Sequence, residues 1–150
     1  GMPIGACCAT EKVAKALNSG SHGSTYGGHP VACAASLASI TEILDNHLSE
    51  NAEEMGAYLR ERLAELPHIK EVRGRGLLTG CEYDIPIALE VKWACFRRHL
   101  LITAIGDSTN RLIPPLTLSK EHVDQAVETM KDAVAEAAMK YEEENMRKSA

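Results

Sequence analysis

The sequence contains few aromatic residues, with one Trp, one Phe and four Tyr in a chain of 150 residues. Its core must therefore be built mainly from Ala, Leu, Val and Ile. Hydrophobic residues make up 45% and charged residues 25%, which is the balance of a globular protein. A chain of this length corresponds to one ordinary domain and can bury a substantial core.

Long apolar runs and an excess of positive charge are also missing. No run approaches 18 consecutive apolar residues, so no membrane-spanning helix is predicted. The N-terminus lacks a basic stretch followed by a hydrophobic segment, so no signal peptide is predicted. A net charge of -5 argues against a nucleic-acid partner. We therefore expect a cytoplasmic protein without membrane or nucleic-acid partners.

The cysteine pattern excludes two kinds of stabilising site. The five cysteines are Cys7, Cys8, Cys33, Cys81 and Cys95. Their number is odd and no Cys-x-x-Cys pair occurs, which argues against a disulfide framework and against a zinc site. No two of the six histidines stand at metal-ligand spacing. The sequence therefore predicts no metal site, and reduced, buried thiols.

The first third of the chain reads as a strand, a short helix and a glycine-rich loop before a longer helix. Residues 3–9 form an apolar run typical of a short buried strand. Thr10 is placed to cap a helix that continues through Leu17. Residues 20–29 are rich in glycine and hydroxyl groups, and Pro30 stands where the first turn of a helix accepts proline.

Periodicity in the remainder predicts alternating helices and strands. The expected elements are a helix over 48–66, strands over 69–73 and 77–83, a helix over 87–98, strands over 101–105 and 111–113, and a helix capped by Ser119. This order favours a small sheet covered by helices, an α/β two-layer domain. The charged residues 142–150 are expected to fray.

Two segments are suited to binding an anion. Residues 23–28 (Gly-Ser-Thr-Tyr-Gly-Gly) offer backbone N–H groups and hydroxyls ahead of a helix, between His22 and His29. Arg111 stands in an apolar context and is followed by two prolines, which stiffen the segment, so its guanidinium could form a two-pronged bond to a carboxylate. From the residues alone, a flexible connection and a structural ion pair remain the alternatives.

Three segments, taken in order, resemble one family. They are residues 2–6 (Met-Pro-Ile-Gly-Ala), residues 22–30 (His-Gly-Ser-Thr-Tyr-Gly-Gly-His-Pro) and residues 111–116 (Arg-Leu-Ile-Pro-Pro-Leu). All three are similar to class III aminotransferases, above all to the acetylornithine and ornithine aminotransferase branch. Residues 72–77 and Gly80 also match this family, so the resemblance spans nearly the whole chain.

The resemblance implies a fold-type I enzyme that works as a homodimer, with pyridoxal 5'-phosphate (PLP) at the interface. The intact enzyme would transfer an amino group from N-acetylornithine or a similar ω-amino donor to 2-oxoglutarate. Thr25 matches the threonine that contacts the cofactor phosphate of the neighbouring subunit. Ser24 matches a residue near the substrate, and Arg111 matches the arginine that binds the substrate α-carboxylate.

Two positions depart from the family pattern. His29 stands where the family usually has asparagine. The family's Schiff-base lysine lies a few residues before the segment that matches residues 2–6, and the eight lysines of this chain all stand elsewhere. The resemblance therefore predicts no catalytic residue in this chain and no transamination by the chain alone.

The expected organisation follows from the same resemblance. Residues 1–28 would be a remnant of the large cofactor-binding domain, 29–47 a connecting helix, 48–146 the C-terminal small α/β domain and 147–150 a tail. Residues 1–9 and the helix from Pro30 would expose apolar surface, which favours a dimer. Two alternatives stay open: a non-catalytic dimerisation or regulatory domain, and a phosphate-binding module built on residues 23–30.

Overall fold

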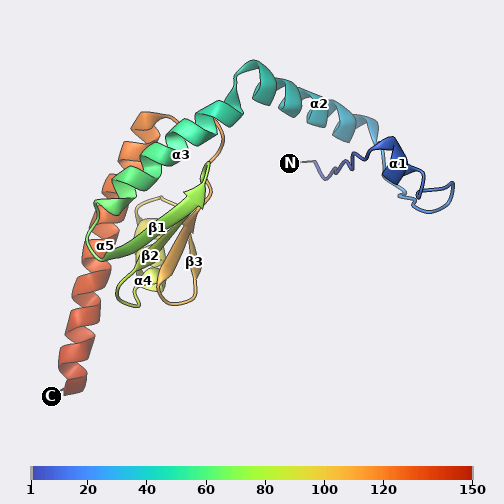
Figure 1. Ribbon diagram of the computed structural model, residues 1–150. Coiled ribbons are helices and arrows are strands. Elements are labelled where there is room, and N and C mark those ends of the chain that lie inside the picture. Colours follow the sequence, from blue (N-terminus) through green and yellow to red (C-terminus); the bar gives the residue numbers. More distant parts are fainter. Residues whose placement is uncertain (1, 150) are drawn as a thin grey trace. The chain divides into compact units, whose positions relative to one another are not determined.

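The computed structural model describes residues 2–149 and divides the chain into two compact units, Gly1–Asn46 and His47–Ala150. The first unit contains two helices, α1 (Glu11–Ala14) and α2 (Pro30–Asp45) (Figure 1). The second contains all the strands of the described residues and three further helices.

Helix α2 begins at Pro30, as predicted, because the fixed φ of proline suits the first helical position. It ends at Asp45, and the backbone N–H of Asn46 donates to the carbonyl of Glu42 at 3.2 Å. Helix α1 is shorter than predicted, since it ends at Ala14 and not at Leu17. Thr10 precedes α1 but forms no side-chain cap hydrogen bond.

The predicted strand over residues 3–9 is wrong, because these residues adopt no regular secondary structure. A strand needs a neighbour to satisfy its backbone groups, and none pairs with this segment in the described residues. Ala32 is the one buried residue among residues 2–46. Large apolar side chains of α2 are exposed, namely Val31, Leu37, Ile40 and Leu44. The described residues of the first unit therefore form no core of their own.

The second unit confirms the predicted α/β arrangement. Its elements are α3 (Leu48–Ala64), β1 (Ile69–Arg75), β2 (Leu78–Tyr83), α4 (Ala88–Arg97), β3 (Thr103–Ile105), β4 (Thr109–Leu112) and α5 (Lys120–Ser149). The strands form one antiparallel sheet in the order β1-β2-β4-β3. The last two strands differ from the prediction, since β3 begins two residues later than Leu101 and β4 begins before Arg111.

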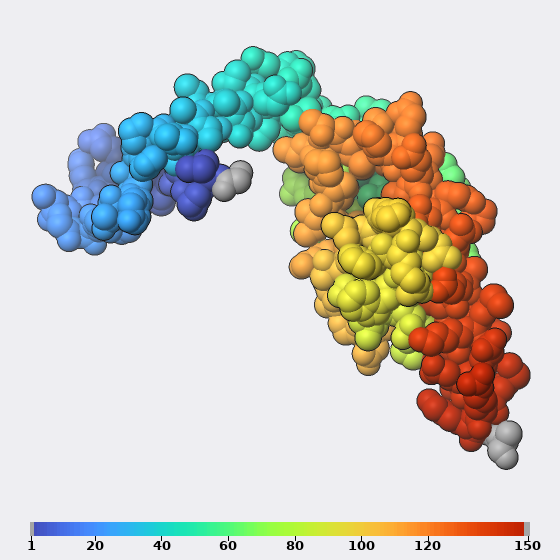
Figure 2. Space-filling model, turned by 180° about the vertical axis from the view of Figure 1, so that it is seen from behind, coloured from blue at the N-terminus to red at the C-terminus, as the bar shows by residue number. Residues whose placement is uncertain are grey.

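Helices cover one face of this sheet. Along β2, Thr79, Cys81 and Tyr83 are buried while the residues between them are only half-buried. Helix α3 contacts β1 and β2, α4 contacts β3 and β4, and α5 packs against α3 and α4. Figure 2 shows α4 and α5 side by side on one face of the second unit. The opposite face of the sheet carries charged residues, among them Arg73, Glu82 and Arg111, and no helix among the described residues of the second unit packs on it.

The core of the second unit is aliphatic, as the composition predicts. The predicted inward faces of α3 and α5 are buried: Leu48, Ala52, Met55, Leu59, Leu63 and Leu66, and then Val123, Val127, Met130, Val134 and Ala137. Complete burial of each larger side chain contributes about 1.5–3 kcal/mol. Tyr83 is the one aromatic residue buried among residues 2–149. This core therefore holds the sheet against its helices without an aromatic cluster.

The turn between β1 and β2 lies directly against α3. A Cβ atom on Gly56 would stand 1.9 Å from the carbonyl oxygen of Gly76, so α3 needs glycine at this contact. Arg60 donates to the same carbonyl oxygen at 2.6 Å. Gly76 has a φ of 51°, in the left-handed region that favours glycine. The hairpin is thereby fixed to the helix that precedes it.

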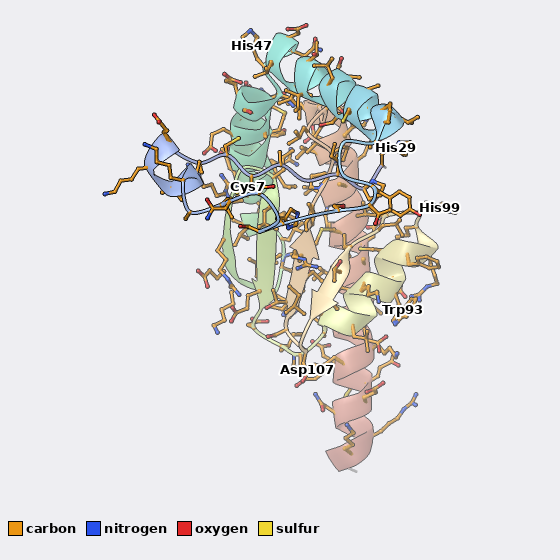
Figure 3. All side chains as sticks on the ribbon, turned by 90° about the vertical axis from the view of Figure 1, so that its right-hand side faces the viewer. Cys7, His29, His47, Trp93, His99 and Asp107 are labelled. Atoms are coloured by element: carbon orange, nitrogen blue, oxygen red, sulfur yellow. The ribbon has the colours of Figure 1, made fainter. Side chains whose placement is uncertain are left out.

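A buried hydrogen-bond network fixes β4. Asn110 is fully buried, and its Oδ1 accepts a hydrogen bond from the Tyr83 hydroxyl at 2.8 Å. Its Nδ2 donates to the carbonyl of Ala88 at 2.9 Å. The backbone N–H of Ala88 donates to the carbonyl of Asp107, which Figure 3 labels in the turn between β3 and β4. The network joins β2, β4 and the start of α4, and so holds the strand that carries Arg111.

The C-terminal residues correct the expected frayed tail. Helix α5 continues to Ser149 and includes residues 142–149, for which fraying is predicted, while Ala150 lies outside the described residues. Ser119 caps its first turn, since its hydroxyl accepts a bond from the His122 N–H at 3.4 Å. None of the helices in residues 2–149 is long and apolar enough to cross a membrane.

The cysteines divide between the two units. Cys81 and Cys95 are buried, and burial raises the pKa of Cys81 to about 12 and that of Cys95 to about 11. The other three, Cys7, Cys8 and Cys33, are exposed, so the prediction of buried thiols is wrong for them. They lie in the first unit, which has no core in which to bury them.

Candidate functional site

The glycine-rich loop of the first unit is formed by two successive turns. The N–H of Gly27 donates to the carbonyl of Ser24, and the N–H of His29 donates to the carbonyl of Tyr26, each at 3.2 Å. Gly28 has a φ of 71°, which a side chain would strain. The loop leads directly into α2, whose first backbone N–H groups are unpaired within the helix. Figure 3 labels His29 at this junction.

A cavity of 420 Å³ lies within the first unit and is bounded by this loop. It brings together the first two sequence motifs, because Pro3, Ile4 and Gly5 line it with residues from His22 to His29. Ser24 lines the cavity, whereas Thr25 does not appear among the lining residues. The Thr25 side chain is exposed and forms no hydrogen bond within residues 2–149. Of the two predicted loop residues, only Ser24 therefore lines this cavity, and Thr25 is exposed in the loop.

Arg111 lies on β4, on the sheet face opposite the helices of the second unit. Its cross-strand neighbours are Gly80 on β2 and Thr103 on β3. The side chain is exposed and forms no ion pair or hydrogen bond with residues 2–149. The predicted alternative, a structural ion pair, is therefore absent from the described part of the chain. The guanidinium N–H groups are therefore free to donate to a carboxylate.

The neighbouring charges of this face are neutralised, in contrast to Arg111. Glu82 accepts hydrogen bonds from Lys70 at 2.6 Å and from Arg73 at 2.7 Å. These bonds, first that from Lys70 and then that from Arg73, hold the pKa of Glu82 below its ordinary value. Arg73 also pairs with Glu71 at 3.2 Å. On this face, Lys70 and Arg73 are therefore paired with carboxylates, whereas Arg111 has no ion-pair partner among the described residues.

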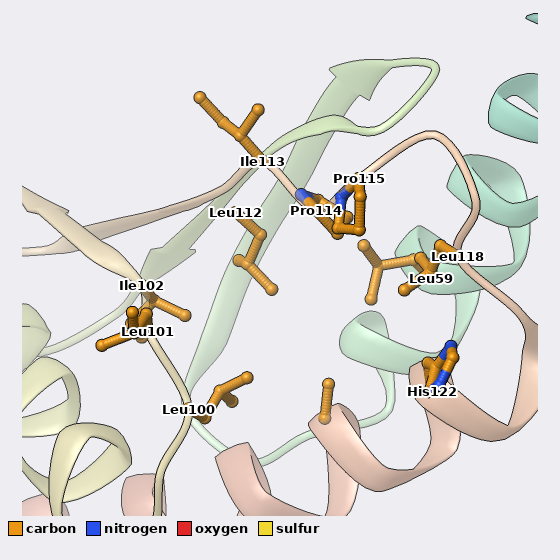
Figure 4. A pocket seen from close by; sticks show the side chains of 11 residues that line it. Leu59, Leu100, Leu101, Ile102, Leu112, Ile113, Pro114, Pro115, Leu118 and His122 are labelled. Carbon is orange, nitrogen blue, oxygen red and sulfur yellow. The ribbon is translucent and has the colours of Figure 1, made fainter. Parts of the chain in front are cut away.

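The segment after Arg111 is held from two sides. Pro114 and Pro115 restrict its backbone, and Asn51 on α3 donates to the carbonyls of Leu116 and Leu118 at 2.7 and 3.0 Å. Beneath the prolines lies an apolar cavity of 320 Å³ (Figure 4). It is lined by Leu59, Leu100, Leu101, Ile102, Leu112, Ile113, Pro114, Pro115, Leu118, His122 and Ala126. No local sequence pattern predicts this cavity, because its lining comes from four separate segments.

A second apolar hollow of 260 Å³ shares part of that lining. Residues 100–102 border both cavities, and the other lining residues come from α4: Lys92, Trp93 and Phe96. The rings of Trp93 and Phe96 meet edge to face at 5.8 Å, and the Lys92 ammonium lies 4.6 Å from the Trp93 ring centre. Figure 3 labels Trp93 on α4. Neither cavity holds a predicted site residue.

Comparison with known protein families assigns the glycine-rich loop and the Arg111 segment to a single family. The family model described as "Aminotransferase class-III" matches residues 1–134, which include the glycine-rich loop, β4 and the double proline. The chain belongs to the class III aminotransferase family. Class III aminotransferases are PLP enzymes, and the predicted family and its cofactor are confirmed.

Curated relatives place this class III aminotransferase chain in the acetylornithine and ornithine branch. It is 37% identical over 140 residues to acetylornithine aminotransferase of Caldanaerobacter subterraneus subsp. tengcongensis, covering 91% of this chain and 35% of the relative. It is 40% identical over 139 residues to ornithine aminotransferase of a Geobacillus species, covering 89% of this chain and 34% of the relative. The chain therefore spans about a third of the length of the curated relatives it matches.

Solved structures of the family share the fold of this class III chain. Acetylornithine aminotransferase of Elizabethkingia anophelis matches with a TM-score of 0.77 and 32% identity, over 85% of this chain and 36% of that one. Ornithine aminotransferase of Toxoplasma gondii, whose active site is partly occupied by PLP, matches with a TM-score of 0.76 and 32% identity, over 86% and 32% of the two chains. The predicted fold class is confirmed.

Proposed function

We propose that this chain supplies the substrate-carboxylate arginine and the phosphate-contacting loop of an aminotransferase. The intact enzyme would move an amino group from N-acetylornithine or a similar ω-amino donor to 2-oxoglutarate. The family and the names of the relatives support the reaction. The observation that carries the assignment within this chain is the exposed Arg111 guanidinium, which has no partner in residues 2–149.

Arg111 would bind the α-carboxylate of the substrate. A guanidinium presents parallel N–H groups that match the two oxygens of a carboxylate. Its backbone is restrained on both sides, because β4 pairs with β2 and with β3. Asn110, buried next to it, fixes the strand from the opposite face. The substrate carboxylate would therefore bind an arginine whose backbone position is already fixed by the sheet.

The glycine-rich loop would contact the cofactor. Ser24 and Thr25 present hydroxyl groups ahead of α2, where backbone N–H groups favour a phosphate. These residues fit the phosphate of PLP, with Thr25 contacting the cofactor of the neighbouring subunit and Ser24 lying near the substrate. PLP, when bound, supplies the electron sink for amino transfer. Ser24 and Thr25 would orient the cofactor and carry out no proton transfer.

The chain alone is proposed to be inactive. Covalent catalysis of this class needs a lysine at the cofactor, and none of the eight lysines stands in a family motif. We further propose that the chain associates as a homodimer in the cytoplasm. The exposed apolar side chains of α2 support association, because such surface is usually covered by a partner.

Titration with glutarate, a dicarboxylate of the same length as 2-oxoglutarate, tests the Arg111 assignment. Backbone amide NMR signals of β4 would be followed at constant ionic strength. We expect saturable shifts with a dissociation constant of about 1–10 mM, which corresponds to one solvent-exposed anchor. The variant Arg111→Gln should bind at least about tenfold more weakly, since it loses the charge-assisted bonds.

Arg75 provides the matched control. It is an exposed arginine near the end of β1 that likewise has no partner in the described residues. Arg75→Gln should leave the glutarate response unchanged, and the neutral diamide of glutarate should produce no saturable shift in the parent chain. Equal weakening by Arg111→Gln and Arg75→Gln would show non-specific attraction and contradict the assignment.

A further inference from the structure

Gly80 is a glycine in the interior of a strand, where glycine is usually avoided. It lies on β2 between two arginines of the same cross-strand row, Arg73 on β1 and Arg111 on β4. A glycine there leaves the strand without a side chain to pack and weakens it. In strand interiors, glycine often marks a point where a ligand or another backbone approaches closely.

The fold itself does not require glycine at this position. A Cβ atom at Gly80 would lie 3.7 Å from Cγ of Arg73 and 4.0 Å from Cγ2 of Thr109, which are ordinary contacts. Its φ is outside the left-handed region. Gly56 differs, because its Cβ would meet a backbone oxygen at 1.9 Å. Neither the backbone conformation nor a close contact within the described residues therefore accounts for glycine at position 80.

The space that Gly80 leaves adjoins the one arginine of its row that lacks an internal partner. Arg73, on one side, is bonded to Glu71 and Glu82. Arg111, on the other, has no partner in residues 2–149. A molecule bound to Arg111 therefore meets open backbone on its β2 side. No helix among the described residues of the second unit packs on this surface, so access comes from the outer face of the sheet.

We infer that Gly80 determines which carboxylates can bind at Arg111, by keeping the surface of β2 open for the chain of the bound substrate. The inference rests on the proposed role of Arg111. The occupant is an aliphatic dicarboxylate or amino acid, whose carboxylate pairs with the guanidinium while its methylene groups lie against β2. Any side chain at position 80 takes up the volume that these methylene groups need.

This role separates binding from stability. Gly80→Ala adds one methyl group, whereas Gly80→Val adds a branched side chain that strands favour. Since a Cβ atom at position 80 meets only ordinary contacts, and since strands favour branched side chains, thermal unfolding should occur at the same or a higher temperature in both variants. Glutarate binding should weaken about two- to threefold in Gly80→Ala and more than about tenfold in Gly80→Val. A purely structural glycine would give the opposite change in stability.

The experiment is the glutarate titration followed by β4 amide signals, together with thermal unfolding of each variant. Thr109→Val is the matched control, because it alters the same face beside Gly80 without adding volume, and it should leave binding unchanged. Unchanged binding in Gly80→Val, with the parent chain still binding through Arg111, would overturn this inference alone. A fall in unfolding temperature that parallels the loss of binding would also overturn it. Absence of binding by the parent chain would overturn the proposed role of Arg111 and this inference together.

Discussion

The hydroxyl of Thr79 is fully buried and has no hydrogen-bond partner among residues 2–149. A buried hydroxyl without a partner keeps its full desolvation penalty. Thr79→Val replaces the hydroxyl with a methyl group of similar volume, so we expect the free energy of unfolding to rise by about 1 kcal/mol. Chemical denaturation measures the change. A lower stability in the valine variant would indicate that the hydroxyl is bonded in solution, for example to a water molecule.

Single residues of the site differ in how far the sequence reveals them. Arg111, Ser24 and Thr25 can be proposed from their motifs, because glycine, proline and hydroxyl patterns are local signals. Asn110 and Gly80 cannot be singled out in this way, since the face of the sheet on which each lies depends on strand register. A strand predicted to begin at Arg111 begins instead at Thr109, and only the observed pairing shows that Asn110 faces the core.

At the scale of elements, the hairpin of β1 and β2 carries a pH-sensitive ion cluster. Lys70 and Arg73 lower the pKa of Glu82 below its ordinary value of 4.5. A carboxylate whose pKa is lowered by folding stabilises the fold above its unfolded pKa, and this contribution is lost as the pH falls through the lowered value. We therefore expect Glu82→Gln to destabilise the chain near neutral pH and to have less effect as the pH falls below about 4.5.

Urea unfolding of both chains at several pH values measures this difference. Glu53→Gln, on the exposed face of α3, serves as the control and should leave stability unchanged at each pH. A stability difference between the parent chain and Glu82→Gln that stays constant from neutral to acidic pH would contradict an ionised Glu82 as the source.

Helices could be predicted more accurately than strands. The apolar faces of α3 and α5 repeat over several turns, so their buried residues follow from periodicity alone. Residues 3–9 have the composition of a strand, but strand formation depends on a neighbouring strand that local sequence does not specify. The charged end of α5 differs from the predicted frayed tail because its residues, although polar, have high helix propensity.

At the scale of the whole molecule, the lysines decide whether the chain can hold PLP covalently. Lys70 and Lys140 have their pKa raised, chiefly by hydrogen bonds from their ammonium groups to Glu82 and Glu90. A lysine that forms a Schiff base is usually activated by a lowered pKa. We expect borohydride trapping with PLP, followed by peptide mapping, to give scattered labelling of the lysines at well below one PLP per chain.

The opposite result would be equally informative. Labelling of a single lysine at one PLP per chain would show that a covalent cofactor site exists within these residues, and would contradict the proposed inactivity. A scrambled peptide that contains the same number of lysines provides the background level. Labelling above that background at one position is the outcome to look for.

The unequal distribution of thiols gives the molecule a built-in means of selective labelling. Three cysteines are exposed in the first unit, while the two in the second are buried and have a raised pKa. Thiolates rather than thiols react with maleimides, so a fluorescent maleimide at neutral pH should attach to the first unit and spare the second. A dye placed in this way would report the motion of one unit while the other stays chemically unaltered, without any engineered cysteine.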